Sequence, residues 1–333
     1  LSLKDFTASK GDSLLGVLHK EPIAQDPSIP QDPSSKDGVP ALLLYDLKNK
    51  DHKGTATYRF IEETVDICSG LYGPSGAGKT RAIYEYLSHN YGLYFAGKTT
   101  NDLGSKDLSE LIEMFQRNHV MDALEFIEVE GDSQAEDFKK NLLKKRLSRN
   151  ERNLCNMERY VMIMVYIRRV VFDAINKQLE VQKKPILTPY DWLLVQLFPR
   201  QALGGKDLFL NVLLRCLVQV NKHRDDSSVS NALVLKGEEW TSPLMVVDEA
   251  QVLLRKLTNF FLTENGTKER AALSAVLKAM SNIPGLLQSE VGFPLVAGTG
   301  MSRDDIREAS DSSMAKRPNT RRTTIFMLAT QMQ

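Results

Sequence analysis

The sequence predicts an α/β fold, in which helices cover a largely parallel β-sheet, and two observations support this prediction. Short apolar runs are typical of buried parallel strands, and they occupy residues 93–96, 244–247, 293–297 and 323–329. Stretches with the 3.6-residue apolar period of a helix lie between these runs, as they do in layered α/β proteins. We therefore expect a central sheet with helices packed on it.

The bulk composition allows such a fold and argues against some classes of protein. Of 333 residues, 42% are hydrophobic and 26% are charged, so the chain can bury a core. The net charge of +1 gives no general attraction to nucleic acid or to an anionic membrane. Cys68, Cys155 and Cys216 lie far apart, each in an apolar stretch, which argues against a disulfide framework or a zinc site. The scattered cysteines, and a sequence in which no leader peptide is recognised, favour a cytoplasmic or nuclear chain.

Changes in composition divide the chain. Residues 1–41 are rich in Pro, Ser and Asp and are predicted to form an arm or linker, and residues 42–333 form the folded domain. Within that domain residues 105–240 form a mostly helical insert, in which residues 125–130 alternate like a strand. Its predicted helices cover residues 107–120, 134–147, 157–179, 189–198 and 207–220.

The helix predicted over residues 157–179 begins with a nearly continuous apolar run. Arg168 and Arg169 interrupt this run before it is long enough to cross a bilayer. We therefore interpret it as a buried core helix and expect no membrane partner.

A phosphate-binding loop is predicted at residues 73–80, which spell G-x-x-x-x-G-K-T. Its glycines let backbone N–H groups point at phosphate oxygens, while Lys79 would reach the β- and γ-phosphates and Thr80 would place its hydroxyl on Mg²⁺. Residues 65–68 before the loop are predicted to be the end of a short strand, and a helical period over residues 81–87 follows the loop. This order favours a phosphate loop over a mere glycine-rich turn. The predicted nucleotide-binding residues are Gly73, Pro74, Ser75, Gly76, Ala77, Gly78, Lys79 and Thr80.

The partner of such a loop is an acid at the end of a buried strand, and Asp248 follows the apolar run at residues 244–247. Asp248 would accept a hydrogen bond from a Mg²⁺-bound water, and Glu249 would polarise the attacking water as general base. The alternative is an ordinary helix start, where Asp and Glu are common. An adjacent Asp–Glu pair is typical of NTPases that have an extra strand between the phosphate-loop strand and the metal-binding strand.

Two residues after another strand are candidates for contact with the γ-phosphate. Thr299 is the candidate sensor of the γ-phosphate or the attacking water, and the alternative is a plain strand-to-helix turn. Arg303 begins a predicted helix that has Ser302 as its N-cap. Arg303 is either an arginine finger, in its own subunit or in a neighbour, or a surface residue whose charge Asp304 and Asp305 offset.

These motifs refine the fold class to a P-loop NTPase three-layer sandwich of the extra-strand (AAA/ASCE-like) class with a large helical insert. The predicted activity is hydrolysis of ATP with Mg²⁺. The alternative is a nucleotide-dependent switch or interaction module with little hydrolysis, and Glu249 favours the enzyme because a switch needs no well-placed base. The sequence has no Asn/Thr-Lys-x-Asp motif for reading guanine, and it permits an oligomer.

Residues 139–152 carry many basic side chains and only one acid, Glu151. They predict either contact with the phosphate backbone of DNA or an import signal read by a nuclear protein. The alternative is a solvated helix face with Leu142, Leu143 and Leu147 inward, and no interleaved aromatic residues indicate stacking on single strands. The basic residues are Lys139, Lys140, Lys144, Lys145, Arg146, Arg149 and Arg152.

Taken together, these segments resemble a known family. The phosphate loop with the following RAIYEYLSHNYGLYF, then MVVDEAQVLL and LVAGTGMS, resembles the NTPase domain of Crinkler-type effectors, which oomycetes and some fungi secrete. The same NTPase type occurs in retrotransposon-hot-spot proteins. The resemblance covers roughly residues 42–333, and its more specific elements are GLYF at residues 92–95 and AGTG at residues 297–300.

The resemblance implies a P-loop ATPase that is secreted, delivered to a host nucleus and often joined to a C-terminal nuclease. It gives the metal and water roles to Asp248 and Glu249 and the sensor role to Thr299, and it repeats the phosphate role of Gly73, Gly78, Lys79 and Thr80. Two family features, a ubiquitin-like header and a nuclease, are not apparent in this sequence.

Overall fold

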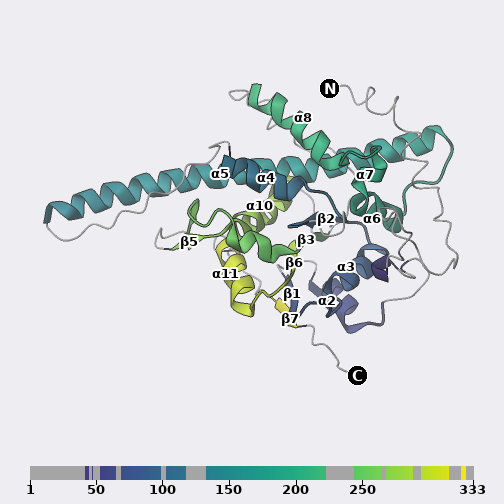
Figure 1. Ribbon diagram of the computed structural model, residues 1–333, viewed down its shortest axis with the longest axis horizontal. Helices are drawn as coiled ribbons and strands as arrows, with labels where there is room; N and C mark the ends of the chain where they lie inside the picture. The colour runs from purple at the N-terminus through teal and green to yellow at the C-terminus, as the bar shows by residue number, and fades with distance from the viewer. Residues whose placement is uncertain are drawn as a thin grey trace.

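The computed structural model describes residues 42–44, 47, 53–64, 69–98, 103–117, 133–222, 244–263, 268–287, 294–314 and 324–327. In these ranges a central sheet is surrounded by helices (Figure 1). Its strands are β1 (Ser69–Gly73), β2 (Gly92–Ala96), β3 (Leu244–Asp248), β6 (Pro294–Thr299) and β7 (Thr324–Met327), and a separate antiparallel pair consists of β4 (Phe261–Leu262) and β5 (Glu269–Arg270). The helices are η1 (Leu42–Leu44), α2 (Ala56–Thr64), α3 (Lys79–Leu87), α4 (Asp107–Arg117), α5 (Ser133–Val181), α6 (Pro189–Leu197), α7 (Pro199–Ala202), α8 (Leu208–Lys222), η2 (Ala250–Arg255), α10 (Ala272–Leu287) and α11 (Arg303–Met314).

The central sheet has the strand order β2-β3-β6-β1-β7, and all neighbouring strands in it run parallel. Parallel neighbours need crossover connections, so the predicted α/β class is confirmed. The register places Ala96 opposite Asp248, and Gly73 opposite Thr299. The ends of four strands therefore lie together at the carboxyl edge of the sheet.

Helices cover both faces of this sheet. On one face Phe95 and Val247 pack with α4, α5, α10 and α11 in a buried cluster. On the other face Tyr94 and Val246 pack with η1, α2, α3 and α6 in a second cluster. Tyr94 and Phe95 point to opposite faces because side chains alternate along a strand. The arrangement is compatible with the predicted three-layer sandwich.

Most predicted elements are confirmed, with ends shifted by a few residues. α6 begins where predicted because Thr188 and Asp191 form a reciprocal capping box around Pro189. Cys155 was expected in an apolar environment, but it is exposed on α5, because it lies on the solvent side of that helix. The predicted arm at residues 1–41 and the strands expected at residues 65–68 and 125–130 lie outside the described residues.

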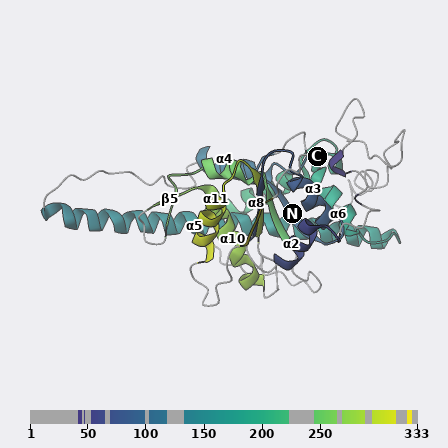
Figure 2. The ribbon, with the colours of Figure 1, turned by 90° about the horizontal axis from the view of Figure 1, so that it is seen from below.

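The two helices predicted over residues 134–147 and 157–179 form one continuous helix, α5, of 49 residues. The residues between them contain no proline or glycine, so nothing interrupts the backbone hydrogen bonding. The second half of α5 packs in the core, whereas its first half extends beyond the other elements in both views (Figure 1, Figure 2). Among the described residues, no helix is long and apolar enough to span a membrane.

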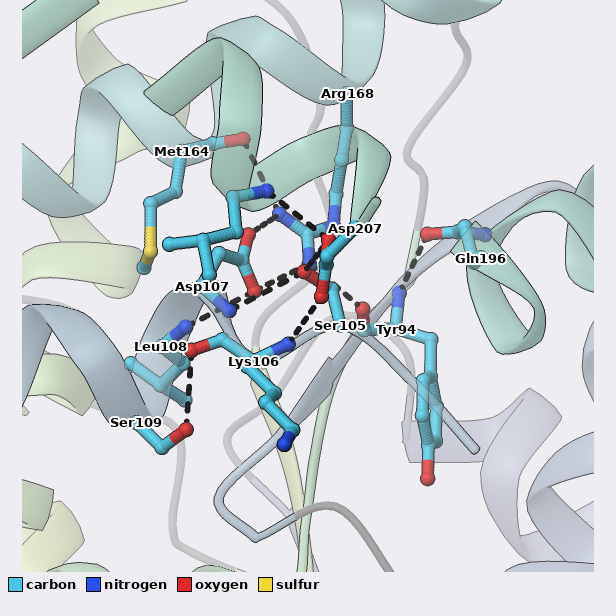
Figure 3. Close-up of polar contacts among 11 residues, drawn as sticks. Tyr94, Ser105, Lys106, Asp107, Leu108, Ser109, Met164, Arg168, Gln196 and Asp207 are labelled. Atoms are coloured by element: carbon cyan, nitrogen blue, oxygen red, sulfur yellow. Dashed lines mark hydrogen bonds and ion pairs between the residues drawn. The ribbon is translucent and has the colours of Figure 1, made fainter. Parts of the chain in front are cut away.

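A buried ion pair fixes α5 to α4 and to the edge of the sheet (Figure 3). Arg168 is fully buried and donates to Asp107 Oδ2 and Oδ1 at 2.5 and 3.1 Å. Its guanidinium carbon lies 3.8 Å from the ring centre of Phe95 and 4.8 Å from that of Phe209. Arg168 Nη2 also donates to the Tyr94 carbonyl at 3.1 Å. The arginine that seemed to interrupt an apolar helix therefore belongs to the core.

β2 lies at an edge of the sheet, and helix side chains satisfy its outward backbone groups. Gln196 of α6 accepts from the Tyr94 N–H at 2.9 Å and donates to the Gly92 carbonyl at 3.1 Å. Trp192 Nε1 also donates to the Gly92 carbonyl, at 3.0 Å, and Arg168 covers the Tyr94 carbonyl. Buried backbone groups at a strand edge need such partners. α5 and α6 thus cover this edge in place of a further strand.

Candidate functional site

A pocket of about 260 Å³ opens at the carboxyl edge of the sheet. This is the usual position of ligands in open α/β sheets. The pocket brings together eight predicted site residues from three separate segments of the chain, Ser75, Gly76, Gly78, Lys79, Thr80, Asp248, Glu249 and Thr299. The other lining residues are Leu43, Arg81, Tyr84, Tyr94, Lys98 and Leu103.

The loop at residues 73–80 forms a tight turn between β1 and α3. Gly76 and Gly78 have φ values of 78° and 85°, a left-handed conformation that glycine adopts without strain. α3 begins directly after Gly78, so the positive end of its dipole lies at the pocket. This combination of backbone turn and helix N-terminus suits an anionic group.

Lys79 lies within the loop and is only 6% exposed. Its Nζ donates to the carbonyls of Gly73 and Pro74 at 2.9 and 2.8 Å. Burial lowers the pKa of the Lys79 amine, while the charges of Asp248 and Glu249 raise it. An ammonium group has three donors, so one remains beyond the two loop contacts.

The loop at residues 73–80 and the end of β3 are joined by a direct contact. Thr80 Oγ1 donates to Asp248 Oδ2 at 2.9 Å, across 168 positions of sequence. The Glu249 N–H donates to Asp248 Oδ1 at 2.9 Å, and the Tyr94 hydroxyl donates to Oδ2 at 3.0 Å. Burial raises the pKa of the Asp248 carboxyl, and these three hydrogen bonds oppose that shift. The two residues predicted to bind the metal are therefore adjacent.

Two buried tyrosines, Tyr94 and Tyr84, lie next to each other beside Asp248. The hydroxyl of Tyr84 on α3 lies 3.4 Å from that of Tyr94 on β2, and their rings pack edge to face. Burial raises the pKa of both tyrosines, and the charge of Asp248 raises it further, so both remain neutral hydroxyls at neutral pH. Sequence reasoning assigned no role to either residue. The available signal was a tyrosine inside a buried strand, because its hydroxyl must find a partner.

Glu249 connects β3 to η2 with φ 53° and ψ 34°, a left-handed conformation. For a residue with a side chain this costs about 1–2 kcal/mol, and such strain concentrates at functional sites. Gln251 Nε2 donates to Glu249 Oε2 at 2.5 Å, and Gln251 Oε1 accepts from the Thr299 N–H at 3.1 Å. Gln251, which sequence reasoning missed, thus links the candidate base to the candidate sensor. A Cβ on Gly298 would lie 2.4 Å from Gln251 Oε1, so a larger residue at this position would displace the Gln251 amide.

Arg303 does not line the pocket, and its side chain is exposed at the start of α11. Ser302 is the N-cap as predicted, because its Oγ accepts from the Asp305 N–H at 3.0 Å. The structure therefore does not bring Arg303 into the site of its own chain. A role in the site of a neighbouring subunit stays a prediction.

The basic segment lies in the first half of α5. Within this segment Arg146 Nη2 lies 3.6 Å from Glu269 Oε1 of β5. Leu142 and Leu147 are half-buried, but Leu143 is 41% exposed, so the expectation of three inward leucines is wrong for Leu143. DNA contact through this segment stays a prediction. A hollow of about 440 Å³ on one side of the helix is lined by Asn141, Lys144, Lys145, Ser148, Arg149 and Arg152.

The oxygen donors in the pocket fit a magnesium ion that binds together with a nucleotide. Mg²⁺ in such sites takes one or two protein oxygens and completes its shell with water and phosphate oxygens. The Thr80 hydroxyl is a donor of this kind, and the Asp248 carboxylate beside it can accept a hydrogen bond from a water of the shell. In the part of the chain that the structure describes, no group of three or more His, Cys, Asp or Glu side chains could hold a metal ion alone.

No family model, curated protein or solved structure matches the chain. The resemblance to Crinkler-type NTPases therefore rests on the motifs alone. Function has to be inferred from the geometry of the pocket and from the chemistry of its residues.

Proposed function

We propose that the chain is a P-loop NTPase that binds and hydrolyses ATP with Mg²⁺. The observation that carries this proposal is the 2.9 Å contact between Thr80 Oγ1 and Asp248 Oδ2, next to a lysine that rests on the loop carbonyls. A hydroxyl, a carboxylate and a lysine are the groups that a phosphate loop uses to bind a magnesium nucleotide. A chance match to the loop motif would not by itself place a strand-end aspartate on its threonine.

The strand order supports the assignment to the extra-strand class. β6 lies between β1, which leads into the loop, and β3, which ends in Asp248. A strand inserted at this place is what the Asp248–Glu249 pair predicts. The order therefore favours this class over one in which the loop strand and the metal-binding strand are direct neighbours.

The side chains of the pocket suggest how hydrolysis would proceed. The Lys79 ammonium would exchange the Gly73 and Pro74 carbonyls for phosphate oxygens, assisted by the positive end of α3. Glu249 would accept a proton from the attacking water at its carboxylate. Gln251 already donates to Glu249 Oε2, and this hydrogen bond orients the carboxylate while Oε1 stays able to accept the proton.

The metal ion would be held by Thr80 and, through water, by Asp248. When bound, Mg²⁺ neutralises charge on the β- and γ-phosphates. Thr80 presents its hydroxyl at the start of α3, and Asp248 presents a carboxylate that Glu249 N–H and Tyr94 also hold.

A nucleotide-dependent switch is the second candidate, and one observation favours it. Glu249 is engaged by Gln251, which also contacts the Thr299 backbone, so the candidate base is restrained in this structure. If that contact keeps the Glu249 carboxylate turned away from the attacking water when nucleotide is bound, hydrolysis would be slow and binding would be the functional event. The two candidates therefore differ in turnover.

The test is ATP binding and hydrolysis by the purified chain with Mg²⁺, compared with Glu249→Gln. For the enzyme we expect Glu249→Gln to bind ATP as the parent does and to turn over about 10²–10⁴-fold more slowly, the range for a positioned general base. Equal slow turnover in both proteins, with tight binding, would favour the switch. Absence of ATP binding by the parent would contradict both candidates.

A Crinkler-like role on host nuclear DNA or a nuclear partner is a further proposal, supported by the resemblance and by the exposed Lys144 and Lys145. DNA titrated over a range of salt concentrations tests it. Neutralising both lysines should flatten the log–log salt dependence of DNA binding by roughly 2. An unchanged slope would favour the alternative, in which this segment is a solvated helix face.

A further inference from the structure

Tyr94 contacts the candidate metal site and the helices of the insert at once. Its hydroxyl donates to Asp248 Oδ2 at 3.0 Å, beside the contact from Thr80. Its main-chain N–H and carbonyl are bound by Gln196 and Arg168 at 2.9 and 3.1 Å. In Figure 3 the Tyr94 backbone lies toward these partners, and its ring points away from Arg168. The residue therefore spans from the sheet edge to the pocket.

The direction of the hydrogen bonds at Tyr94 follows from the chemistry of its partners. An ionised aspartate only accepts hydrogen bonds, so the single proton of the Tyr94 hydroxyl goes to Asp248. The Tyr94 oxygen can then only accept from the Tyr84 hydroxyl, 3.4 Å away. The result is a directed chain from Tyr84 through Tyr94 to Asp248, and such chains strengthen their terminal bond.

Each oxygen of the Asp248 carboxylate has its own partners. Oδ1 accepts from the Glu249 N–H, and Oδ2 accepts from Thr80 and Tyr94. Thr80 is itself expected to bind the metal ion, so Tyr94 is the side chain that holds Asp248 without being a ligand. Partners of this kind orient metal ligands, and their loss typically lowers metal affinity 10–100-fold.

Tyr94 can serve this purpose because it is itself held firmly. It is 4% exposed, and Arg168, which holds its carbonyl, is locked in the buried ion pair with Asp107. The Tyr94 hydroxyl is therefore held in one position relative to Asp248. We propose that Tyr94 is a positioning residue, which holds the Asp248 carboxylate in the orientation that takes up Mg²⁺; this inference rests on the proposed nucleotide site.

The experiment compares the parent with Tyr94→Phe, which keeps the packed ring and removes only the hydroxyl. The probe is a fluorescent, slowly hydrolysed ATP analogue, whose binding is measured against Mg²⁺ concentration and also in EDTA. We expect Tyr94→Phe to need about 10-fold more Mg²⁺ for half-maximal enhancement of binding. Binding in EDTA should match that of the parent, because the phosphate loop and Lys79 are unchanged.

Tyr84→Phe is the matched control, since it removes an equally buried hydroxyl that does not touch Asp248. We expect its Mg²⁺ requirement to stay within about 2-fold of the parent, because it only weakens the donor chain. A parent-like Mg²⁺ requirement in Tyr94→Phe would overturn the inference, as would an equal loss of binding in EDTA, which indicates a structural role. A parent that binds no nucleotide under either condition would instead contradict the proposed function, and the inference with it.

Discussion

Lys79 and Arg168 are both buried cations, but the molecule holds them in different ways. The Lys79 amine is bound by two neutral carbonyls of its own loop, and the loop opens on a pocket. The Arg168 guanidinium is fully buried, paired with the Asp107 carboxylate and stacked on Phe95. Lys79 has exchangeable partners at the carboxyl edge of the sheet. Arg168 has fixed partners beside the edge strand β2.

This difference indicates what each charge is for. A cation that rests on neutral carbonyls gives up little when a phosphate replaces them, so Lys79 is suited to binding an anion. A cation that is buried in an ion pair with a carboxylate cannot change partners without leaving an unpaired buried charge. Arg168 is therefore structural, and its position next to Tyr94 makes the helical insert part of the support of the site.

The largest effect is expected from a substitution that breaks the ion pair between Arg168 and Asp107. Asp107→Leu leaves the Arg168 charge buried without its carboxylate, which should lower the free energy of unfolding by about 3–5 kcal/mol. Chemical denaturation measures this. The double variant Asp107→Leu with Arg168→Met is the control, because it removes both charges and should regain part of the loss. A single variant as stable as the parent would show that the pair is not structural.

The next effect concerns the exchangeable cation. Lys79→Ala should weaken binding of ATP by about 1.5–3 kcal/mol, or roughly one to two powers of ten, because a charge-assisted hydrogen bond to phosphate is lost. Calorimetry or fluorescence titration measures this affinity. Lys98→Ala is the matched control, since Lys98 also lines the pocket but lies outside the phosphate loop. Equal ATP affinity in Lys79→Ala and the parent would remove the phosphate role of the loop.

The same comparison shows what the sequence could predict. The loop, the strand ends and Asp248 were predictable because each belongs to a short motif. In these motifs glycine, lysine and aspartate stand at set positions along the sequence. The α/β class was predictable from the apolar runs, because buried parallel strands are apolar on both faces. These signals come from short segments of sequence. The structure confirms the strands predicted at residues 93–96, 244–247, 293–297 and 323–329, with shifted ends.

The other half of the comparison depends on contacts between distant segments. Arg168 appeared to interrupt an apolar helix, since its partners Asp107 and the Tyr94 carbonyl lie 61 and 74 positions away. Gln251 gave no signal because, besides Glu249, it contacts the backbone N–H of Thr299, which lies 48 positions away at the end of β6. Even α5 was divided in two, because a polar, basic half and an apolar half look like separate helices when their burial is unknown.

The smallest expected effect concerns a third cation, Arg303, which is exposed and lies outside the pocket. Arg303→Ala should change the free energy of unfolding by no more than about 0.5 kcal/mol, as for other surface substitutions. Because the side chain does not reach the site of its own chain, ATP turnover by monomeric protein should also match that of the parent. Steady-state hydrolysis over a range of protein concentrations measures this.

An arginine finger donated to a neighbouring subunit would give a different result. Turnover of Arg303→Ala would then fall by about 10³-fold or more, while ATP binding stayed normal. An excess of Lys79→Ala chains, which keep Arg303 but bind ATP poorly, should restore turnover to Arg303→Ala chains in that case. Loss of activity without rescue would mean that Arg303 reaches its own site in the nucleotide-bound state. Arg303 would then share with Lys79 the property that separates both from Arg168, a charge that changes partners when the anion binds.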